Sequence, residues 1–157
     1  MAVYYLDTSA LVKRYVQEAG TAWVLDLTDV RTAHDLYTVR VTGPEMIAAF
    51  FRRARSRDVS WDDATRSAGS FRTDWQQQYQ IVEVTAGLAD QAMALAEKHG
   101  LRGCDAVHLA AACTLQQMRA LMELPSLIFV SADAQQKEAA AAAGLPVEDP
   151  NDHNSSG

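Results

Sequence analysis

Short apolar runs alternate with helical patterns along this chain, and that alternation limits the folds it can adopt. Strands alternating with helices favour a parallel sheet that is covered by helices on both faces. We therefore predict an α/β fold with three layers (α/β/α) and a central, mostly parallel sheet of four to five strands. The predicted strands cover 2–7, 37–41, 81–84 and 127–131, and the predicted helices cover 9–18, 21–29, a segment starting near 42, 61–79, 86–99, 103–121 and 133–143.

The length of 157 residues and a hydrophobic content of 48% predict one globular domain, which we place at 1–150. The polar residues 151–157 are expected to form a frayed tail. The longest apolar runs are too short to span a membrane, and no basic leader precedes the first strand. Cys104 and Cys113 lie nine residues apart on one predicted helix, where a mutual disulfide is implausible. We therefore expect a cytoplasmic protein with no membrane association.

Four acidic residues stand where predicted strands or helices begin or end. Asp7 closes the first strand and Asp133 follows the last, while Glu45 and Asp105 each open a helix. In an open α/β sheet the carboxyl ends of parallel strands line one edge, where ligands bind. Carboxylates gathered there would repel one another without bound cations, so the pattern indicates a hard divalent metal such as Mg²⁺ or Mn²⁺. The sequence is typical of a metal-dependent enzyme.

Each of these acids also has an ordinary structural explanation. Asp7 and Asp133 could cap the helices that follow them, and Thr42-x-x-Glu45 matches a capping box. Asp105 could complement the dipole of its helix. The joint pattern favours a site, because a carboxylate at the end of a central strand is costly unless it is paired or metal-bound. A dehalogenase-like phosphotransferase is disfavoured, because it needs a second acid at the position of Ser9.

The segment between Arg40 and Arg72 is basic, although the whole chain has a net charge of −6. It holds seven arginines and four acids, so it could follow a phosphate backbone or form an ordinary solvated surface. On the helix that starts near Thr42, we interpret Arg53 and Arg57 as the best-aligned pair for RNA. The same helix carries an apolar stripe at Ile47, Phe50, Phe51 and Ala54.

Two other residues near Asp105 are predicted to have structural rather than catalytic roles. His108, three residues further along the same helix, is more typical of a packed histidine than of a metal ligand or base. Cys104 is expected to be a small buried residue, since no histidine and asparagine arrangement supports a nucleophile.

Several motifs together resemble one known family. The opening Tyr5-Leu6-Asp7-Thr8-Ser9-Ala10-Leu11-Val12-Lys13 resembles that of PIN-domain ribonucleases, specifically toxins of the VapC type. The stretch 101–110 is similar to the central acidic motif of the family, 129–133 to its last acidic strand end, and 144–147 to its usual ending. Glu45 falls where the family has the glutamate that opens its third helix.

This resemblance implies a metal-dependent endoribonuclease, the toxin of a toxin–antitoxin pair, that cuts RNA and is neutralised by a small VapB-like antitoxin. It also implies a homodimer. The alternative is a catalytically weak PIN-like module that binds RNA or a partner. The chain departs from the family after Asp133: the family often has a basic residue directly after this position, whereas here the first one is Lys137. The resemblance implies that one or two Mg²⁺ or Mn²⁺ ions are bound by Asp7, Glu45, Asp105 and Asp133, with support from Thr8, Ser9 and Ser131.

Overall fold

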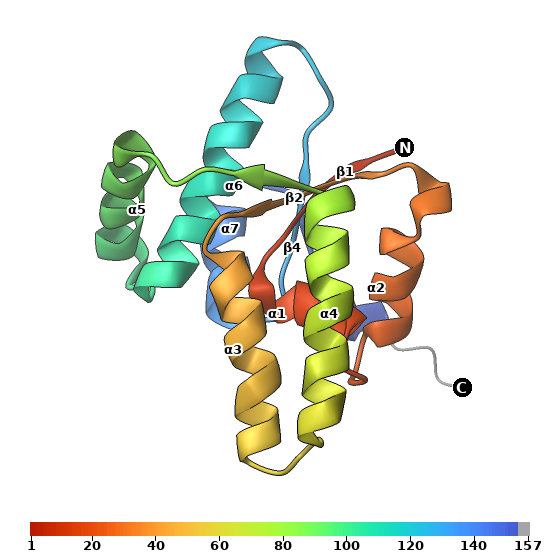
Figure 1. Ribbon diagram of the computed structural model, residues 1–157. Helices are drawn as coiled ribbons and strands as arrows, with labels where there is room; N and C mark the ends of the chain where they lie inside the picture. The colour runs from red at the N-terminus through yellow and green to blue at the C-terminus, as the bar shows by residue number, and fades with distance from the viewer. Residues whose placement is uncertain (154–157) are drawn as a thin grey trace.

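A computed structural model describes residues 1–153, and its centre is a five-stranded parallel sheet in the order β3-β2-β1-β4-β5 (Figure 1). This confirms the predicted α/β/α architecture. The strands are β1 (Val3–Leu6), β2 (Asp35–Val39), β3 (Tyr79–Val82), β4 (Ile128–Val130) and β5 (Val147–Glu148). The α-helices are α1 (Thr8–Leu11), α2 (Thr21–Thr28), α3 (Thr42–Arg55), α4 (Trp61–Gln77), α5 (Ala86–His99), α6 (Gly103–Leu121) and α7 (Ala134–Ala142). Short 3₁₀ helices are η1 (Val12–Arg14), η2 (Val30–Thr32) and η3 (Pro150–His153).

The first strand occupies the middle of the sheet, as the sequence predicts. β1 pairs with β2 on one side and with β4 on the other, and Tyr5 lies opposite both Tyr37 and Phe129. The carboxyl ends of β1 and β4 therefore lie side by side, which brings Asp7 and the residues after β4 to the same edge. A backbone hydrogen bond from Asp7 N to Val130 O (3.1 Å) closes this edge.

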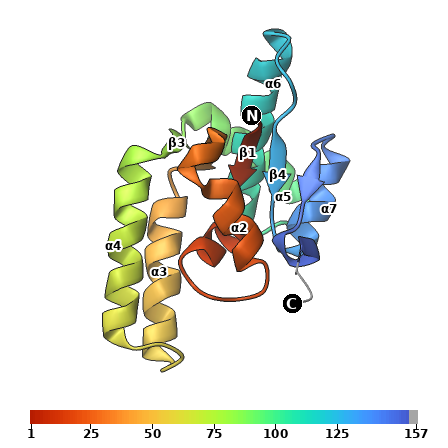
Figure 2. The same ribbon diagram turned by 90° about the vertical axis from the view of Figure 1, so that its right-hand side faces the viewer.

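Helices cover both faces of the sheet and bury a separate apolar core on each (Figure 2). Tyr5 and Phe129 belong to the core beneath α5, α6 and α7, whereas Leu6, Phe50 and Phe71 belong to the core beneath α2, α3 and α4. Successive strand residues point to opposite faces, so neighbours such as Tyr5 and Leu6 enter different cores. Burial of each large side chain contributes about 1.5–3 kcal/mol to folding.

Several predicted boundaries are wrong by a few residues. The predicted strand 37–41 is observed as β2 (Asp35–Val39), and 81–84 as β3 (Tyr79–Val82), because pairing with the sheet sets the register. The predicted helix 9–18 ends at Arg14. The edge strand β5 carries no pattern of its own and exists because Phe129 N and Ser131 N donate to Pro146 O and Glu148 O.

α3 and α4 form an antiparallel hairpin on one face of the sheet (Figure 1). The predicted apolar stripe of α3 is confirmed: Phe50 is fully buried, and Phe51 packs on Trp61 with ring centroids 4.9 Å apart. α3 ends at Arg55, and Arg57 has a left-handed backbone (φ +65°) in the turn that follows. The predicted alignment of Arg53 and Arg57 on one helix face is therefore wrong.

The predicted tail begins with residues 151–153. They belong to η3. The imidazole of His153 stacks on Trp23 with ring centroids 4.4 Å apart, and its Nε2 donates to Glu148 Oε2 at 2.8 Å. The rest of the predicted tail, 154–157, lies outside the described residues. Among residues 1–153, none of the helices is both long and apolar enough to cross a lipid bilayer.

Candidate active site

All four predicted acids line one cavity at the carboxyl ends of β1 and β4. Its volume is about 600 Å³. The predicted supporting residues Thr8 and Ser9 also line it, and so do five further residues: Arg52, Arg102, Gly103, Cys104 and His108. The cavity is lined by Asp7, Thr8, Ser9, Glu45, Arg52, Arg102, Gly103, Cys104, Asp105, His108 and Asp133.

Asp7 is the most deeply placed of the four acids, with only 3% of its surface exposed. It caps α1, because its Oδ1 accepts hydrogen bonds from Ala10 N (3.0 Å) and from the Ser9 hydroxyl (2.6 Å). Burial raises the pKa of Asp7, and the charge of His108 and the hydroxyls of Ser131 and Ser9 offset only part of that effect. Asp7 is therefore both the N-cap that its position predicted and a member of the acidic cavity.

Glu45 faces the cavity from the first turn of α3. Its Oε1 accepts hydrogen bonds from Thr8 Oγ1 (2.8 Å) and lies 2.8 Å from His108 Nε2. Burial acts to raise the pKa of Glu45, but the hydrogen bonds and the charge of His108 outweigh it and lower that pKa. The capping-box interpretation is wrong: Val41 is the N-cap of α3, and the Thr42 hydroxyl pairs instead with Thr38 (2.7 Å).

Asp105 and Asp133 are joined by a single arginine. Arg102 Nε donates to Asp105 Oδ2 at 3.1 Å, and Arg102 Nη2 lies 3.6 Å from Asp133 Oδ2. The Arg102 side chain is 78% exposed, so these ion pairs are weak individually. Asp133 also caps α7 by accepting from Gln136 N at 2.8 Å, as its ordinary interpretation predicted.

Hydroxyl groups connect the ends of β1 and β4 beneath these acids. Ser9 Oγ donates to Asp7, accepts from Ala132 N (2.9 Å) and lies 3.4 Å from Ser131 Oγ. Ser131 Oγ accepts from Asp133 N at 3.1 Å. These contacts fix the backbone at both strand ends and leave the Asp7 carboxylate in a defined orientation.

The structural roles predicted for His108 and Cys104 have different outcomes. His108 is buried, which confirms a packed histidine, but its Nε2 also lies against the site at Glu45. Cys104 is exposed, so its predicted burial is wrong. The reason is that α6 begins at Gly103, which leaves Cys104 in the first turn on the cavity side rather than within the core.

The donor set fits a hard divalent cation, because carboxylate oxygens are the preferred ligands of Mg²⁺ and Mn²⁺. The buried Asp7 carboxylate in particular has hydroxyl and amide partners but no cationic side chain within ion-pair distance among the described residues. Within residues 1–153, however, no three His, Cys, Asp or Glu side chains are grouped closely enough to hold an ion as they stand. The guanidinium of Arg102 lies between two of the acids. Metal binding by the four acids therefore stays a prediction.

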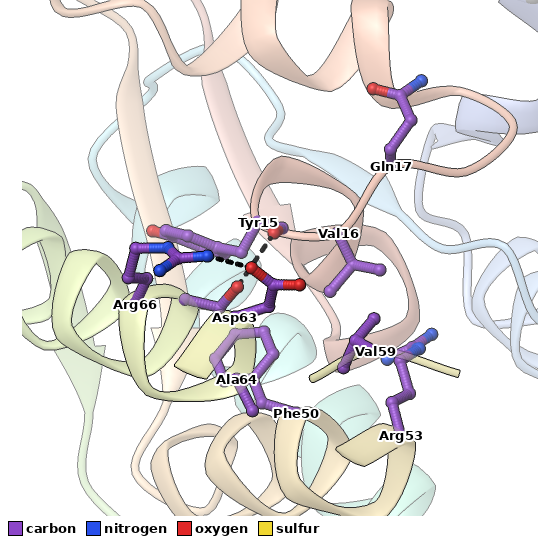
Figure 3. Close-up of a pocket in the computed structure, with 10 residues that line it drawn as sticks. Tyr15, Val16, Gln17, Phe50, Arg53, Val59, Asp63, Ala64 and Arg66 are labelled. Atoms are coloured by element: carbon purple, nitrogen blue, oxygen red, sulfur yellow. Dashed lines mark hydrogen bonds and ion pairs between the residues drawn. The ribbon is translucent and has the colours of Figure 1, made fainter. Parts of the chain in front are cut away.

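A chain of cavities extends from the acids along α3. Arg52, Thr8 and Ser9 line both the acidic cavity and a neighbouring one of about 510 Å³, which Arg53 also lines. Arg53 then borders a third cavity of about 270 Å³ between α3, α4 and the segment 15–17 (Figure 3). Arg57 lines a separate cavity beside Trp61. The basic residue nearest the acids on α3 is thus Arg52, which the sequence did not rank first.

The comparisons with known proteins agree with this architecture. A family model described as PIN domain matches residues 4–142. Two curated proteins of Mycobacterium tuberculosis, Ribonuclease VapC45 and Ribonuclease VapC49, are each 32% identical to the chain over 147 residues, covering 94% of it and 95% of each relative.

Solved structures share the fold at lower identity. The crystal structure of PAE2754 from Pyrobaculum aerophilum superposes with a TM-score of 0.64 at 19% identity, covering 96% of this chain and 91% of the other. VapBC2 from Rickettsia felis, bound to a DNA fragment from its promoter, gives 0.60 at 14% identity, covering 94% and 98%. The match over 4–142 and the 32% identity over most of the chain show that this protein belongs to the PIN domain family.

Proposed function

We propose that this protein is a metal-dependent endoribonuclease and the toxin of a toxin–antitoxin pair. One observation carries this proposal: a buried carboxylate, Asp7, shares a cavity with three further acids in a PIN domain. The names of the curated relatives, both ribonucleases, support the reaction class. The two free cysteines support a reducing compartment such as the cytoplasm.

The residues of the cavity have distinct proposed roles. Bound Mg²⁺ or Mn²⁺, one or two ions, would acidify a water and neutralise charge on the phosphate. Asp7, Glu45, Asp105 and Asp133 would hold the ions. Ser9 orients Asp7 through its 2.6 Å hydrogen bond.

RNA would approach along α3, because the acidic cavity itself repels a polyanion. Arg52 borders the acids and Arg53 borders the next two cavities, so positive charge continues away from the site in one direction. Arg53 is held in place by an ion pair with Glu18 at 3.1 Å. We propose Arg52 and Arg53 as the phosphate contacts, in place of the pair Arg53 and Arg57.

A charge-matched pair of double variants tests this path. Arg52→Ala with Arg53→Ala should flatten the salt dependence of RNA binding by about one to two units of slope. Arg55→Ala with Arg57→Ala removes the same charge further from the acids and should change the slope less. Equal slopes for the two double variants would show that only net charge matters.

Cleavage itself is tested with purified protein and a mixed RNA substrate. Wild-type protein should cut RNA with Mg²⁺ or Mn²⁺ and not with excess EDTA, and Asp7→Asn should lose cleavage. Asp26→Asn, an exposed aspartate on α2, is the matched control and should cut normally. Folded wild-type protein that binds RNA but never cuts it would favour the alternative, a catalytically weak binding module.

The partner is proposed from the fold neighbours, whose titles include VapBC2 from Rickettsia felis and a toxin–antitoxin complex from Klebsiella pneumoniae. We propose that a small VapB-like antitoxin binds this chain and that the chain forms a homodimer. Expression alone should arrest growth, and co-expression with the product of the adjacent reading frame should restore it. Sedimentation of the purified chain as a monomer would contradict the homodimer.

A further inference from the structure

His108 forms hydrogen bonds through both nitrogens of a ring that is only 1% exposed. Its Nδ1 lies 2.9 Å from the Tyr5 hydroxyl, and its Nε2 lies 2.8 Å from Glu45 Oε1. Thr8 Oγ1 is 3.2 Å from the same Nε2 and donates to the same Glu45 oxygen. Any buried histidine needs a polar partner for each ring nitrogen, but here the partner of Nε2 is one of the four predicted site acids.

The donor and acceptor inventory assigns the protons in this network. The Glu45 carboxylate can only accept, so Nε2 must carry the proton that lies between them. Nδ1 accepts from the Tyr5 hydroxyl when the ring is neutral and donates to it when the ring is charged. In both states Nε2 donates to Glu45, and Thr8 donates to Glu45 from the other side.

The anchor of this network is part of the rigid core. The Tyr5 ring stacks on Phe129 with centroids 5.5 Å apart and planes 4° apart, and it meets the His108 ring edge-on. Tyr5 stands two residues before Asp7 on β1, and His108 stands one turn after Asp105 on α6. The network thus links the strand that carries one acid to the helices that carry two others.

We propose that His108, held by Tyr5, is a positioning residue that fixes Glu45 so that only its Oε2 remains for a ligand. Both protein contacts fall on Oε1, so Oε2 is the oxygen of Glu45 that would be left to hold a divalent cation. This inference rests on the proposed function, in which the ligand of Glu45 is Mg²⁺ or Mn²⁺. Partners of this kind orient ligating groups, and their loss typically costs about 10–100-fold in metal affinity.

The first test needs neither metal nor activity. Nitrogen NMR of metal-free, ¹⁵N-labelled protein should show His108 protonated at Nε2, the nitrogen that faces Glu45. Tyr5→Phe removes only the hydroxyl and should change the Nδ1 signal or mix the two tautomers. A His108 ring protonated at Nδ1 alone, or signals unchanged by Tyr5→Phe, would overturn the proposed network.

The second test measures Mn²⁺ binding by titration calorimetry. His108→Leu should weaken binding by about 10–100-fold, whereas His108→Gln keeps a nitrogen donor for Glu45 and should weaken it less. His34→Leu is the matched control at the opposite edge of the sheet, where His34 accepts from Ala2 N, and it should bind as the wild type does. Tyr5→Phe, with the smaller volume change, serves if His108→Leu does not fold.

The outcomes of this titration separate the two proposals. Wild-type affinity in a folded His108→Leu variant would overturn the positioning role and leave the proposed nuclease intact. Absence of Mn²⁺ binding by the wild-type protein would instead contradict the proposed function, and the NMR result would still decide whether the hydrogen-bond chain exists. An unchanged KM for RNA with a lower kcat in His108→Leu would support positioning at the metal rather than loss of substrate binding.

Discussion

Replacement of Asp7 by asparagine should stabilise the metal-free protein while weakening its response to metal. The shape of the side chain is retained, so the Oδ1 acceptor for Ala10 N and for Ser9 remains. What disappears is a buried charge without a cationic partner. Unsatisfied buried polar groups cost about 1–3 kcal/mol, and the two hydrogen bonds offset part of this, so we expect a gain of about 1–2 kcal/mol.

For a chain of this size, 1 kcal/mol shifts the melting temperature by about 2–4 °C, so Asp7→Asn should melt about 2–8 °C higher in EDTA. Mn²⁺ at about 100 times its Kd should stabilise the wild type by about 2.7 kcal/mol, or about 5–11 °C. If loss of the ligand weakens Kd about 100-fold, the variant gains only about 0.4 kcal/mol. The order of the two melting temperatures should therefore reverse when Mn²⁺ replaces EDTA.

The pH dependence of the same pair follows from the raised pKa of Asp7. The charged form of Asp7 begins to destabilise the metal-free fold as the pH rises above the unfolded pKa, and the full penalty applies above the raised folded pKa. Protonation of Asp7 removes this penalty as the pH falls. The advantage of Asp7→Asn in EDTA should therefore shrink toward acid pH. Differential scanning calorimetry decides the matter, with Asp26→Asn as a control that should not shift. A variant that melts lower than the wild type in EDTA, or that responds equally to Mn²⁺, would refute the reasoning.

Three further outcomes are expected. Arg102→Ala removes the cation that joins two acids and should raise Mn²⁺ affinity severalfold while weakening RNA binding; calorimetry showing weaker Mn²⁺ binding would contradict this. Burial, and after it the charge of nearby carboxylates, raises the pKa of the Cys104 thiol. Mn²⁺ should lower that pKa and speed alkylation of Cys104. Cys113, whose pKa is raised by burial alone, should react at an unchanged rate in the same mass-spectrometric assay. Burial acts to raise the pKa of Asp149, but the ion pair with Lys137 outweighs it and lowers that pKa. The stabilisation from this pair is therefore present above the unfolded pKa of Asp149 and is lost as the pH falls through the lowered folded pKa. In urea unfolding, Lys137→Met should destabilise the fold at pH 7 and progressively less near pH 3.

The homologous motifs were recognisable in the sequence because their chemistry is local. Asp7 directly follows an apolar run and opens a helix with Thr8 and Ser9, a pattern that the backbone itself requires at a strand-to-helix turn. The same holds for Asp133 before α7. The placement of both at one edge then follows from parallel pairing alone, so the shared cavity could be predicted without coordinates.

Other features depend on contacts that are distant in sequence. Glu45 matched a capping box locally, yet its carboxylate turns to Thr8 and His108, 37 and 63 residues away. No local pattern distinguishes these alternatives, because the local and the tertiary hydrogen bonds compete for the same oxygens. The contacts of Glu45 with Thr8 of α1 and His108 of α6 decide between them.

The basic segment illustrates the same division. Its composition predicted positive charge on α3, but which arginine reaches the acids depends on where the helix ends and how it packs on the sheet. Phe50 faces the core and α3 ends before Arg57, so Arg52, and not Arg57, borders the acidic cavity. The sequence by itself determined the alternation of strands and helices along the chain and the position of the four acids at the ends of these elements, since both follow from local patterns. Only the tertiary structure decided the His108 network and the direction of positive charge, because both arise from side chains that meet across separate elements.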